Sequence, residues 1–289
     1  MKERGFTIIG PGAVGKALMK FFMAQRYQIK TVWDRNKIYH YLDNEKRDVI
    51  KKNEISISED DLGSFIFITV PDDQIKPISM ELADLDVNWK GRSVIHSSGN
   101  LTSDECIALK NQGAMVASMH PIQTFTQGDG ADRFIDIFVS LEGDESLTLL
   151  LSELIYSMGA NPVTLDAYQK RKLHLASVFA CNYLIALLGQ SEKLLNESNI
   201  DEGLHLLKPL ILRTLENLFT KGVQKSLTGP ISRGDIESVQ KQMVMIEDDS
   251  SLSLLYKLLG LEALKITEKR GILSSDVMDE LAKILAVEN

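Results

Sequence analysis

The sequence predicts an α/β protein in two domains, a doubly wound parallel sheet followed by an all-α C-terminal domain. Two observations lead to this prediction. Short apolar runs alternate with helix-like segments through residues 1–165, as in parallel sheets whose strands are joined by helices. From Asp166 onward only long helix-like segments follow. We therefore expect a first domain over 1–165 and a helical domain over 166–289.

The first domain shows the hydrophobic periods of both strands and helices. Residues 65–70 lack polar alternation, which indicates a strand covered on both faces. Residues 13–25 carry a stripe at i, i+4, i+7 and i+8, which indicates an amphipathic helix. Strands are predicted at 6–9, 29–33, 65–70, 93–96, 115–119 and 137–141, and helices at 13–25, 73–85, 103–112 and 145–158. The charged segment 43–61 is predicted to form a surface helix and loop. Later helices are predicted at 167–195, 201–221, 234–246, 250–270 and 274–287.

Composition excludes several classes of partner. The net charge of -8 repels polyanions, so nucleic acid is not an expected partner. Cys106 and Cys181 stand far apart and outside any CxxC pair, which argues against a disulfide framework or zinc site and fits a reducing compartment. No secretory signal and no uninterrupted apolar stretch of about 18–20 residues is present. We expect a cytoplasmic protein with no membrane span and no metal.

A glycine-rich segment follows the first predicted strand and opens the first helix. It reads Gly10, Pro11, Gly12, Ala13, Val14, Gly15, which matches the GxGxxG pattern of Rossmann dinucleotide-binding domains. In that pattern the first glycine permits a tight turn, the second lets the backbone approach a pyrophosphate, and the third lets helix and strand pack closely. The helix N-terminus then supplies amide groups and partial positive charge for the phosphates. A plain strand-to-helix turn is the alternative.

The cofactor that this segment predicts is NAD or NADP. Asp34 ends the second predicted strand, where a carboxylate can accept hydrogen bonds from the ribose of NAD. Arg35 follows it and could pair with the 2′-phosphate of NADP, or be a solvated surface charge. The choice between the two nicotinamides stays open.

Three further loops follow predicted strands and are expected on the same edge of the sheet. Val70, Pro71 and Asp72 follow the third strand and are predicted to contact the cofactor, although Pro71 and Asp72 also suit a helix start. The fourth strand leads into a polar loop whose predicted cofactor contacts are Ser97 and Ser98, and whose predicted substrate contacts are Gly99 and Asn100. His120 ends the fifth predicted strand. Turn formation is the alternative for the loop after the fourth strand, and a hydrogen-bonded structural histidine is the alternative for His120.

Two segments of the helical domain carry unusual polar groups. On the helix over 168–190, His174 and Ser177 share one face with Asn182 at its edge, while Lys172 lies nearly opposite. A helix–helix seam is the alternative there. Between two later helices, Arg233 could hold a carboxylate, and the neighbouring predicted substrate contacts are Thr228, Gly229, Pro230 and Asp235. An interhelical turn with Asp235 as helix N-cap is the alternative.

Taken together, these segments resemble Rossmann-like proteins whose C-terminal helical domain is of unknown function. That family is similar to ketopantoate reductase, pyrroline-5-carboxylate reductase, prephenate dehydrogenase and the deazaflavin-dependent NADP reductases. The resemblance implies NAD(P) binding and a homodimer through the helical domain, and some members resemble ketopantoate reductases of pantothenate synthesis. One departure concerns the catalytic lysine, which in the related enzymes precedes an asparagine by four residues. Here Lys172 is followed at that spacing by Ala176.

The predicted function is therefore NAD(P)H-dependent reduction of a small carboxylated ketone, with ketopantoate as the leading substrate. The alternatives are another keto acid, a cyclic imine, or a non-catalytic NAD(P) sensor. Since imidazole titrates near neutral pH, His174 and then His120 are the predicted proton donors. Arg233 would hold the substrate carboxylate, while Ser98, Asn100 and Asn182 would orient the carbonyl.

Overall fold

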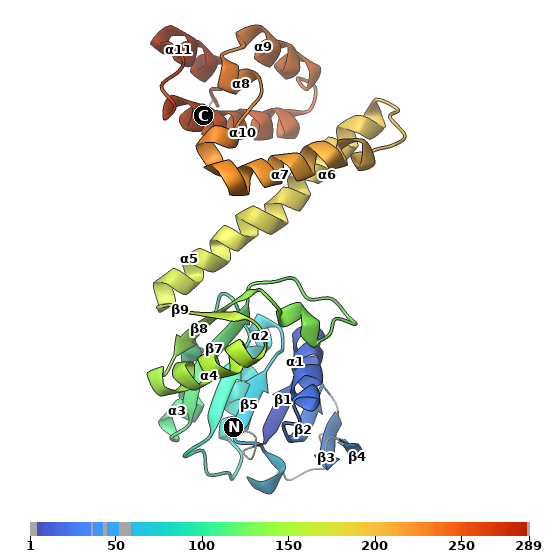
Figure 1. The fold of residues 1–289 in the computed structure, drawn as a ribbon, viewed down its shortest axis with the longest axis vertical. Coiled ribbons are helices and arrows are strands. Elements are labelled where there is room, and N and C mark those ends of the chain that lie inside the picture. The colour runs from blue at the N-terminus through green and yellow to red at the C-terminus, as the bar shows by residue number, and fades with distance from the viewer. Residues whose placement is uncertain (1–4, 36, 43–44, 52–58, 288–289) are drawn as a thin grey trace. The chain divides into compact units, whose positions relative to one another are not determined.

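A computed structural model describes residues 5–35, 37–42, 45–51 and 59–287. The chain divides into two compact units, Met1–Ala180 and Cys181–Asn289, each of which is described by itself (Figure 1). The first unit is a mixed α/β domain and the second is helical. The predicted fold class is therefore confirmed.

The described strands of the first unit form one sheet in the order β4-β3-β2-β1-β5-β6-β7-β8-β9. They are β1 (Phe6–Ile9), β2 (Ile29–Asp34), β3 (Lys37–Leu42), β4 (Glu45–Lys51), β5 (Phe65–Ile68), β6 (Ser93–His96), β7 (Met115–Pro121), β8 (Phe138–Gly143) and β9 (Asn161–Thr164). The central strands β2, β1, β5, β6 and β7 run parallel. From β1 the chain moves outward to β2 and later returns to β5 on the other side of β1. The boundary between β1 and β5 is thus the switch point of the sheet, where open α/β sheets bind their ligands.

Both ends of the sheet depart from the parallel pattern that the sequence predicts. β3 pairs antiparallel with β2, and β4 with β3, so the helix predicted within 43–61 is wrong over residues 45–51. Charged side chains there suggested a surface helix, but charge is also common on strands at the edge of a sheet. Residues 43, 44 and 52–58 lie outside the described residues. At the other end β8 pairs antiparallel with β7, and neither β3 nor β9 was predicted from the sequence.

Helices cover both faces of the sheet. On one face α1 (Ala13–Ala24) and α4 (Glu145–Ser157) bury apolar side chains with an aromatic group in which the rings of Phe6 and Phe22 lie 4.2 Å apart. On the other face α2 (Asp72–Ala83) and α3 (Ile107–Asn111), which follows a short 3-10 turn (Ser103–Cys106), bury a second group that includes Trp89. These two cores hold the strand ends rigidly in place.

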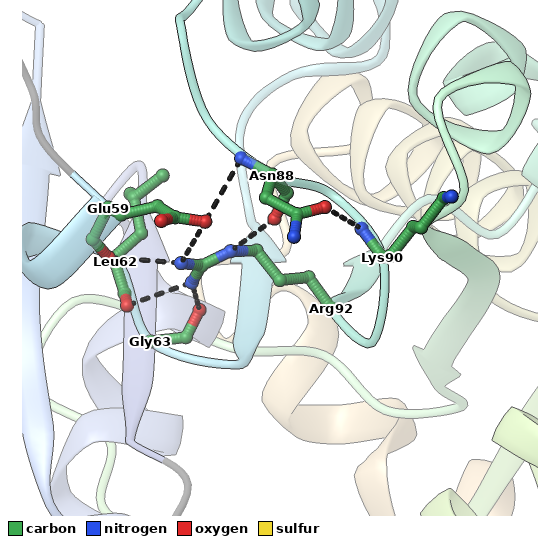
Figure 2. A network of polar contacts seen from close by, with 6 residues as sticks. All are labelled: Glu59, Leu62, Gly63, Asn88, Lys90 and Arg92. Carbon is green, nitrogen blue, oxygen red and sulfur yellow. Dashed lines mark hydrogen bonds and ion pairs between the residues drawn. The ribbon is translucent and has the colours of Figure 1, made fainter.

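Arg92 joins the segments that precede β5 and β6 at the amino-terminal edge of the sheet through hydrogen bonds to their backbones (Figure 2). Its guanidinium donates hydrogen bonds to the backbone oxygens of Leu62 and Gly63, each at 3.0 Å, and to those of Glu59 at 3.0 Å and Asn88 at 3.1 Å. The Glu59 carboxylate lies 3.9 Å from the same guanidinium and accepts the Asn88 amide. Because β5 and β6 start here, this network fixes the edge opposite to the one that carries the functional loops.

The helix α5 (Ala167–Ser177) begins at a well-defined residue. Asp166 and Gln169 form a reciprocal capping box, with the Gln169 amide 2.8 Å from the Asp166 carboxylate. This start fixes which face of α5 meets the sheet. A π-helical turn (Val178–Asn182) and α6 (Tyr183–Glu197) continue the same helical stretch.

The stretch Ala167–Glu197 is long and apolar enough to cross a membrane by length and composition, with a window of mean hydropathy 1.4 that is nowhere buried. One such helix is weak evidence for a membrane span, because helices that pack in cores and interfaces have the same composition.

The helical unit has a small core of its own. After α6 it contains α7 (Leu204–Ser226), α8 (Pro230–Arg233), α9 (Ile236–Met245), α10 (Ser250–Glu268) and α11 (Ser275–Ile284). The core comprises Val239, Leu264, Leu281 and Leu285. Side chains of Asp235, Asp249 and Ser274 cap the starts of α9, α10 and α11. Neither α6 nor α7 has a buried residue in the described chain, so their apolar side chains remain accessible.

Candidate functional site

A cavity of about 660 Å³ lies at the switch point of the sheet. It is lined by the residues that end three neighbouring strands. Gly10, Pro11 and Gly12 follow β1, Asp34 and Arg35 end β2 and follow it, and Thr69, Val70, Pro71 and Asp73 follow β5. The sheet therefore brings the predicted cofactor segments together, whereas the predicted residues that do not line the cavity are Ala13, Val14, Gly15, Asp72, Ser97 and Ser98.

The three glycines of the motif differ in why a side chain is absent. Gly10 has a φ of +85° and an added Cβ would lie 2.4 Å from the Val70 side chain. A Cβ on Gly15 would lie 2.5 Å from Thr69 Oγ1 and 2.6 Å from the Gly10 carbonyl oxygen. At Gly12, by contrast, a Cβ would meet only the Thr69 carbonyl oxygen, at 3.9 Å. Packing within the protein thus explains Gly10 and Gly15, while Gly12 leaves space on the cavity side.

The start of α1 faces the same cavity. Gly12 is the N-cap and offers no side chain to the first amide groups of the helix. Amides in the first turn of a helix have no partner within the helix, and they carry partial positive charge. A cavity bordered by such a helix start can hold an anionic group.

The end of β2 supplies both of the groups that the sequence analysis weighed. The Asp34 carboxylate accepts the Arg35 amide at 2.7 Å, and both residues are exposed and line the cavity. The wall at this point therefore offers an acceptor for a ribose hydroxyl and a cation for a phosphate. The geometry accommodates NAD and NADP alike.

Lys170 is buried against the loop that follows β6. It comes from α5, is 2% exposed, and its Nζ donates to the Ser98 carbonyl oxygen and to Ser118 Oγ, each at 2.6 Å. Ser118 Oγ in turn donates to the same Ser98 oxygen at 3.1 Å. An ammonium has three protons, and the described contacts use two. No third hydrogen bond of the ammonium occurs among the described contacts.

Burial makes Lys170 a moderate acid. Desolvation lowers the pKa of this amine to about 8, against the opposing influence of Glu142 and Asp72. Glu142 is itself occupied by Ser103, whose amide and hydroxyl each lie 2.8 Å from its carboxylate. The ammonium is therefore held without a direct carboxylate partner among the described residues.

His96 holds the loop that Lys170 contacts. Its Nε2 lies 3.0 Å from the Thr102 carbonyl oxygen, and its Nδ1 accepts the Ser98 amide at 3.2 Å. These partners require a neutral ring with the proton on Nε2. Burial and the charge of Lys170 lower the pKa of His96 to about 4, in agreement with that tautomer. His96 is thus a structural support for the loop.

The two predicted proton donors lie together on the other side of this loop. The rings of His120 and His174 are 6.4 Å apart, and a Cβ on Gly99 would lie 2.7 Å from His120 Cε1 and 2.8 Å from His174 Nδ1. Burial, followed by the charge of Lys170, lowers the pKa of His120 to about 4. His120 is consequently neutral near pH 7 and unsuited to donate a proton as a cation.

The loop after β6 also forms a tight turn. Ser98 Oγ accepts the amides of Asn100 at 3.1 Å and Leu101 at 2.9 Å, so the turn interpretation is confirmed for this serine. Ser98 contributes its backbone oxygen to the site, and its hydroxyl is used within the turn. The Ser98 hydroxyl oxygen accepts both amides, and its role in orienting a substrate carbonyl stays a prediction.

Several of the other predicted residues are described within their own units. The Ser177 hydroxyl donates to the Leu173 carbonyl oxygen at 3.0 Å. Asn182 and Arg233 are exposed and belong to the helical unit. Asp235 caps α9 through the amide and hydroxyl of Ser238, so the capping interpretation is confirmed for it.

Lys170 is the functional candidate that the sequence analysis missed. Lys172 was considered instead, but it is exposed and lies over the Tyr168 ring. The available signal was the spacing of four residues between Lys170 and His174, which puts both on one face of α5.

The described residues contain no group of three or more potential metal ligands from His, Cys, Asp and Glu. Both cysteines are free thiols.

Comparisons with known proteins agree with this fold. The family model described as a domain of unknown function (DUF2520) matches residues 137–263. No curated protein matches the chain. Among solved structures, a Bacteroides fragilis protein named as an NADP oxidoreductase is similar over 90% of this chain and 97% of its own, with 18% identity and a TM-score of 0.69. Protein TM1727 of Thermotoga maritima matches over 92% and 99%, with 22% identity and a TM-score of 0.67.

An imine reductase of Myxococcus stipitatus in complex with NADP+ is similar over 96% of this chain and 99% of its own, with 15% identity and a TM-score of 0.57. At these identities the similarity establishes the fold.

Proposed function

We propose that this protein is an NAD(P)H-dependent reductase of a small carbonyl compound that also carries a carboxylate. The observation on which this rests is the geometry at Gly12. No protein atom explains the missing side chain there, whereas a pyrophosphate approaching the start of α1 would. Solved structures of the same fold that are described as NADP oxidoreductases or as bound to NADP+ support the same cofactor.

Within this proposal each wall of the cavity has a role. The start of α1 binds the pyrophosphate, Asp34 or Arg35 contacts the adenosine ribose, and Val70 and Pro71 pack beside the cofactor. The nicotinamide, when bound, supplies a hydride to the carbonyl carbon. The protein must then supply a proton to the carbonyl oxygen.

Lys170 is the proton donor in this proposal. Its described hydrogen bonds use two of its three protons, its pKa of about 8 keeps it mostly protonated at neutral pH, and its position is fixed by Ser98 and Ser118. The proton passes from Nζ to the oxygen that develops negative charge, and the amine regains a proton from solvent. His174 lies one helical turn away and orients the same oxygen.

The charge of the cluster favours a carbonyl over an imine substrate. A developing alkoxide is stabilised by a nearby ammonium, whereas a protonated imine would be repelled by it. Two carboxylates, those of Glu142 and Asp72, act on Lys170 through their charge. Glu142 is bound to Ser103 and Asp72 is exposed, and no described contact pairs either of them directly with the ammonium. The direct neighbour of the substrate oxygen in this proposal is thus a cation, which argues against the cyclic-imine alternative, although imine reductases share the fold.

The specific substrate that we propose to test first is ketopantoate, on the strength of the family resemblance. The experiment follows the loss of NADPH and NADH absorbance with ketopantoate, other small 2-oxo acids and a cyclic imine of similar size. Turnover of a 2-oxo acid with either nicotinamide is expected. Turnover confined to the imine would contradict the carbonyl proposal. Tight nicotinamide binding without any turnover would favour the sensor alternative.

A second proposal concerns the assembly. Exposed apolar side chains are numerous on α6 and α7, among them Ile185 at 72%, Leu210 at 65% and Phe219 at 86%. Surfaces of this kind mark interaction sites. We propose that a second copy of the chain covers them in a homodimer. Light scattering should give the mass of a dimer, and Phe219→Glu should shift it toward the monomer, whereas a monomeric wild-type protein would contradict the proposal.

A further inference from the structure

The helical unit contains a cavity of about 420 Å³ with two arginines in its wall. Arg270 follows the end of α10, and Arg233 ends the short α8. The other lining residues are Leu227, Thr228, Gly229, Ser232, Ile272 and Leu273. The predicted substrate contacts Thr228 and Gly229 are joined by Arg270 only in the folded unit.

One edge of the Arg270 guanidinium is held in place by the protein. Its Nη1 donates to the Leu227 carbonyl oxygen at 3.0 Å and to Ser232 Oγ at 2.7 Å. Ser232 is 4% exposed, so this anchor is rigid. The described hydrogen bonds of Arg270 all come from Nη1, so its Nε and Nη2 donors are available to a ligand.

The charge of the cavity is uncompensated within its own wall. Arg233 brings a second guanidinium, and none of the eight lining residues is acidic. Asp235, two residues further on, does not line the cavity, and its pKa is lowered first by the hydroxyl and amide of Ser238, which it binds as the cap of α9, and then by the charge of Arg233. Two like charges in one wall repel each other, and an oxyanion between them removes that repulsion.

The same wall has an apolar part. Leu227, Ile272 and Leu273 line it, and Ile272 is 58% exposed. Thr228 adds a hydroxyl beside the arginines. The cavity thus offers guanidinium groups that can bind an oxyanion, and branched aliphatic side chains that can contact the carbon chain of the same ligand. A planar guanidinium matches a carboxylate through two parallel hydrogen bonds.

We propose that this cavity binds the carboxylate of a small aliphatic acid between Arg270 and Arg233, with the carbon chain against Leu227 and Ile272. The acid is either the substrate of the proposed reductase or a separate ligand. Naming the substrate rests on the proposed function, but the binding of the acid does not.

The test is a calorimetric titration of the full-length protein without nicotinamide. The probes are isovalerate, 2-oxoisovalerate and succinate, with isovaleramide as the neutral counterpart and inorganic phosphate as the competing oxyanion. At least one carboxylate should bind, and isovaleramide should not. Arg233→Gln should weaken binding about tenfold or more, as expected for loss of a charge-assisted hydrogen bond. Arg213→Gln is the control, since Arg213 is an exposed arginine of α7 that pairs with Glu216.

Arg270 also fastens Leu227 and Ser232, so its removal could unfold the unit. Arg270→Lys keeps a positive charge, and its folding is checked by a cooperative melt. The Arg270→Lys variant should bind the carboxylate more weakly, because a lysine lacks the two parallel N–H donors of the guanidinium. The proposal is overturned if no carboxylate binds, if isovaleramide binds equally, if phosphate binds more tightly than every carboxylate, or if Arg233→Gln and Arg213→Gln behave alike.

Steady-state kinetics then separates the two sources of the acid. A raised KM with an unchanged kcat in Arg233→Gln identifies the substrate as the ligand. An unchanged KM together with weakened carboxylate binding identifies a separate acid. If a carboxylate binds in an Arg233-dependent way but no carbonyl compound is reduced, the proposed reductase activity fails and the carboxylate site stands.

Discussion

Replacing Lys170 with methionine should abolish most of the activity while leaving the fold intact or more stable. Burial lowers the Lys170 pKa from 10.5 to about 8, which corresponds to roughly 3 kcal/mol against the charged form in the folded protein. Methionine has a similar length and removes that penalty. The Ser98 carbonyl oxygen keeps a donor in Ser118. We therefore expect a free energy of unfolding between the wild-type value and about 3 kcal/mol above it.

Catalysis should respond in the opposite direction. Loss of a general acid typically lowers kcat about 10²–10⁴-fold. The assay is steady-state reduction of the best 2-oxo acid with NADPH, combined with a urea melt of the same preparation. In the wild-type enzyme kcat/KM should fall as the pH rises above about 8, because the Lys170 ammonium loses its proton there.

The matched control is Lys172→Met on the same helix, since Lys172 is exposed and lies over Tyr168. It should retain near-normal turnover and the alkaline fall in rate. The reasoning is refuted if Lys170→Met keeps kcat within about threefold of wild type. It is also refuted if the variant is inactive only because it no longer melts cooperatively.

Three further predictions concern the cofactor, acid stability and the opposite edge of the sheet. Gly12→Ala should keep the wild-type melting temperature but bind NADPH about tenfold more weakly. Gly15→Ala should lower the free energy of unfolding by about 1–3 kcal/mol, because its Cβ would lie 2.6 Å from a carbonyl oxygen. Equal melting temperatures of the two variants would contradict this difference between the glycines. The pKa values of His96 and His120 are about 4 when folded, against 6.5, so the unfolded chain binds more protons between these values. Stability should therefore fall as the pH drops from about 6.5 to 4, and His120→Gln should reduce that loss in pH-dependent urea melts. Arg92→Met should lower the free energy of unfolding by about 2–4 kcal/mol, because the hydrogen bonds of Arg92 to backbone oxygens are lost. Its affinity for NADPH, measured by calorimetry, should stay unchanged. A parallel loss of affinity would argue against a purely structural role of Arg92.

Local patterns predicted the centre of the sheet well and its edges poorly. Strands such as 65–68 have both faces covered, so their apolar runs are unambiguous. The edge strands β4 and β9 have little apolar character to detect. β4 is rich in charge, and β9 contains Pro162 in a run of four residues. In both cases pairing with a neighbouring strand, rather than local preference, stabilises the element.

The candidate site divides in the same way. The cofactor segment was predictable because a strand, three glycines and a helix lie within twenty residues of one another, and their roles depend on local backbone geometry. Ser98 and Asp235 were each assigned two interpretations, since serine and aspartate suit turns and caps as well as ligands. Only the hydrogen bonds of the folded chain decide which interpretation holds.

The sequence by itself determined the central strands of the sheet, the helices between them and the position of the glycine turn, because these depend on periodicity and on backbone conformations near each residue. Only the tertiary structure decided that Lys170, and not Lys172, is the buried lysine of α5. Its contacts come from residues 72 and 52 positions away. Burial by distant segments sets its pKa, and no local pattern records how much water the rest of the chain removes from a side chain.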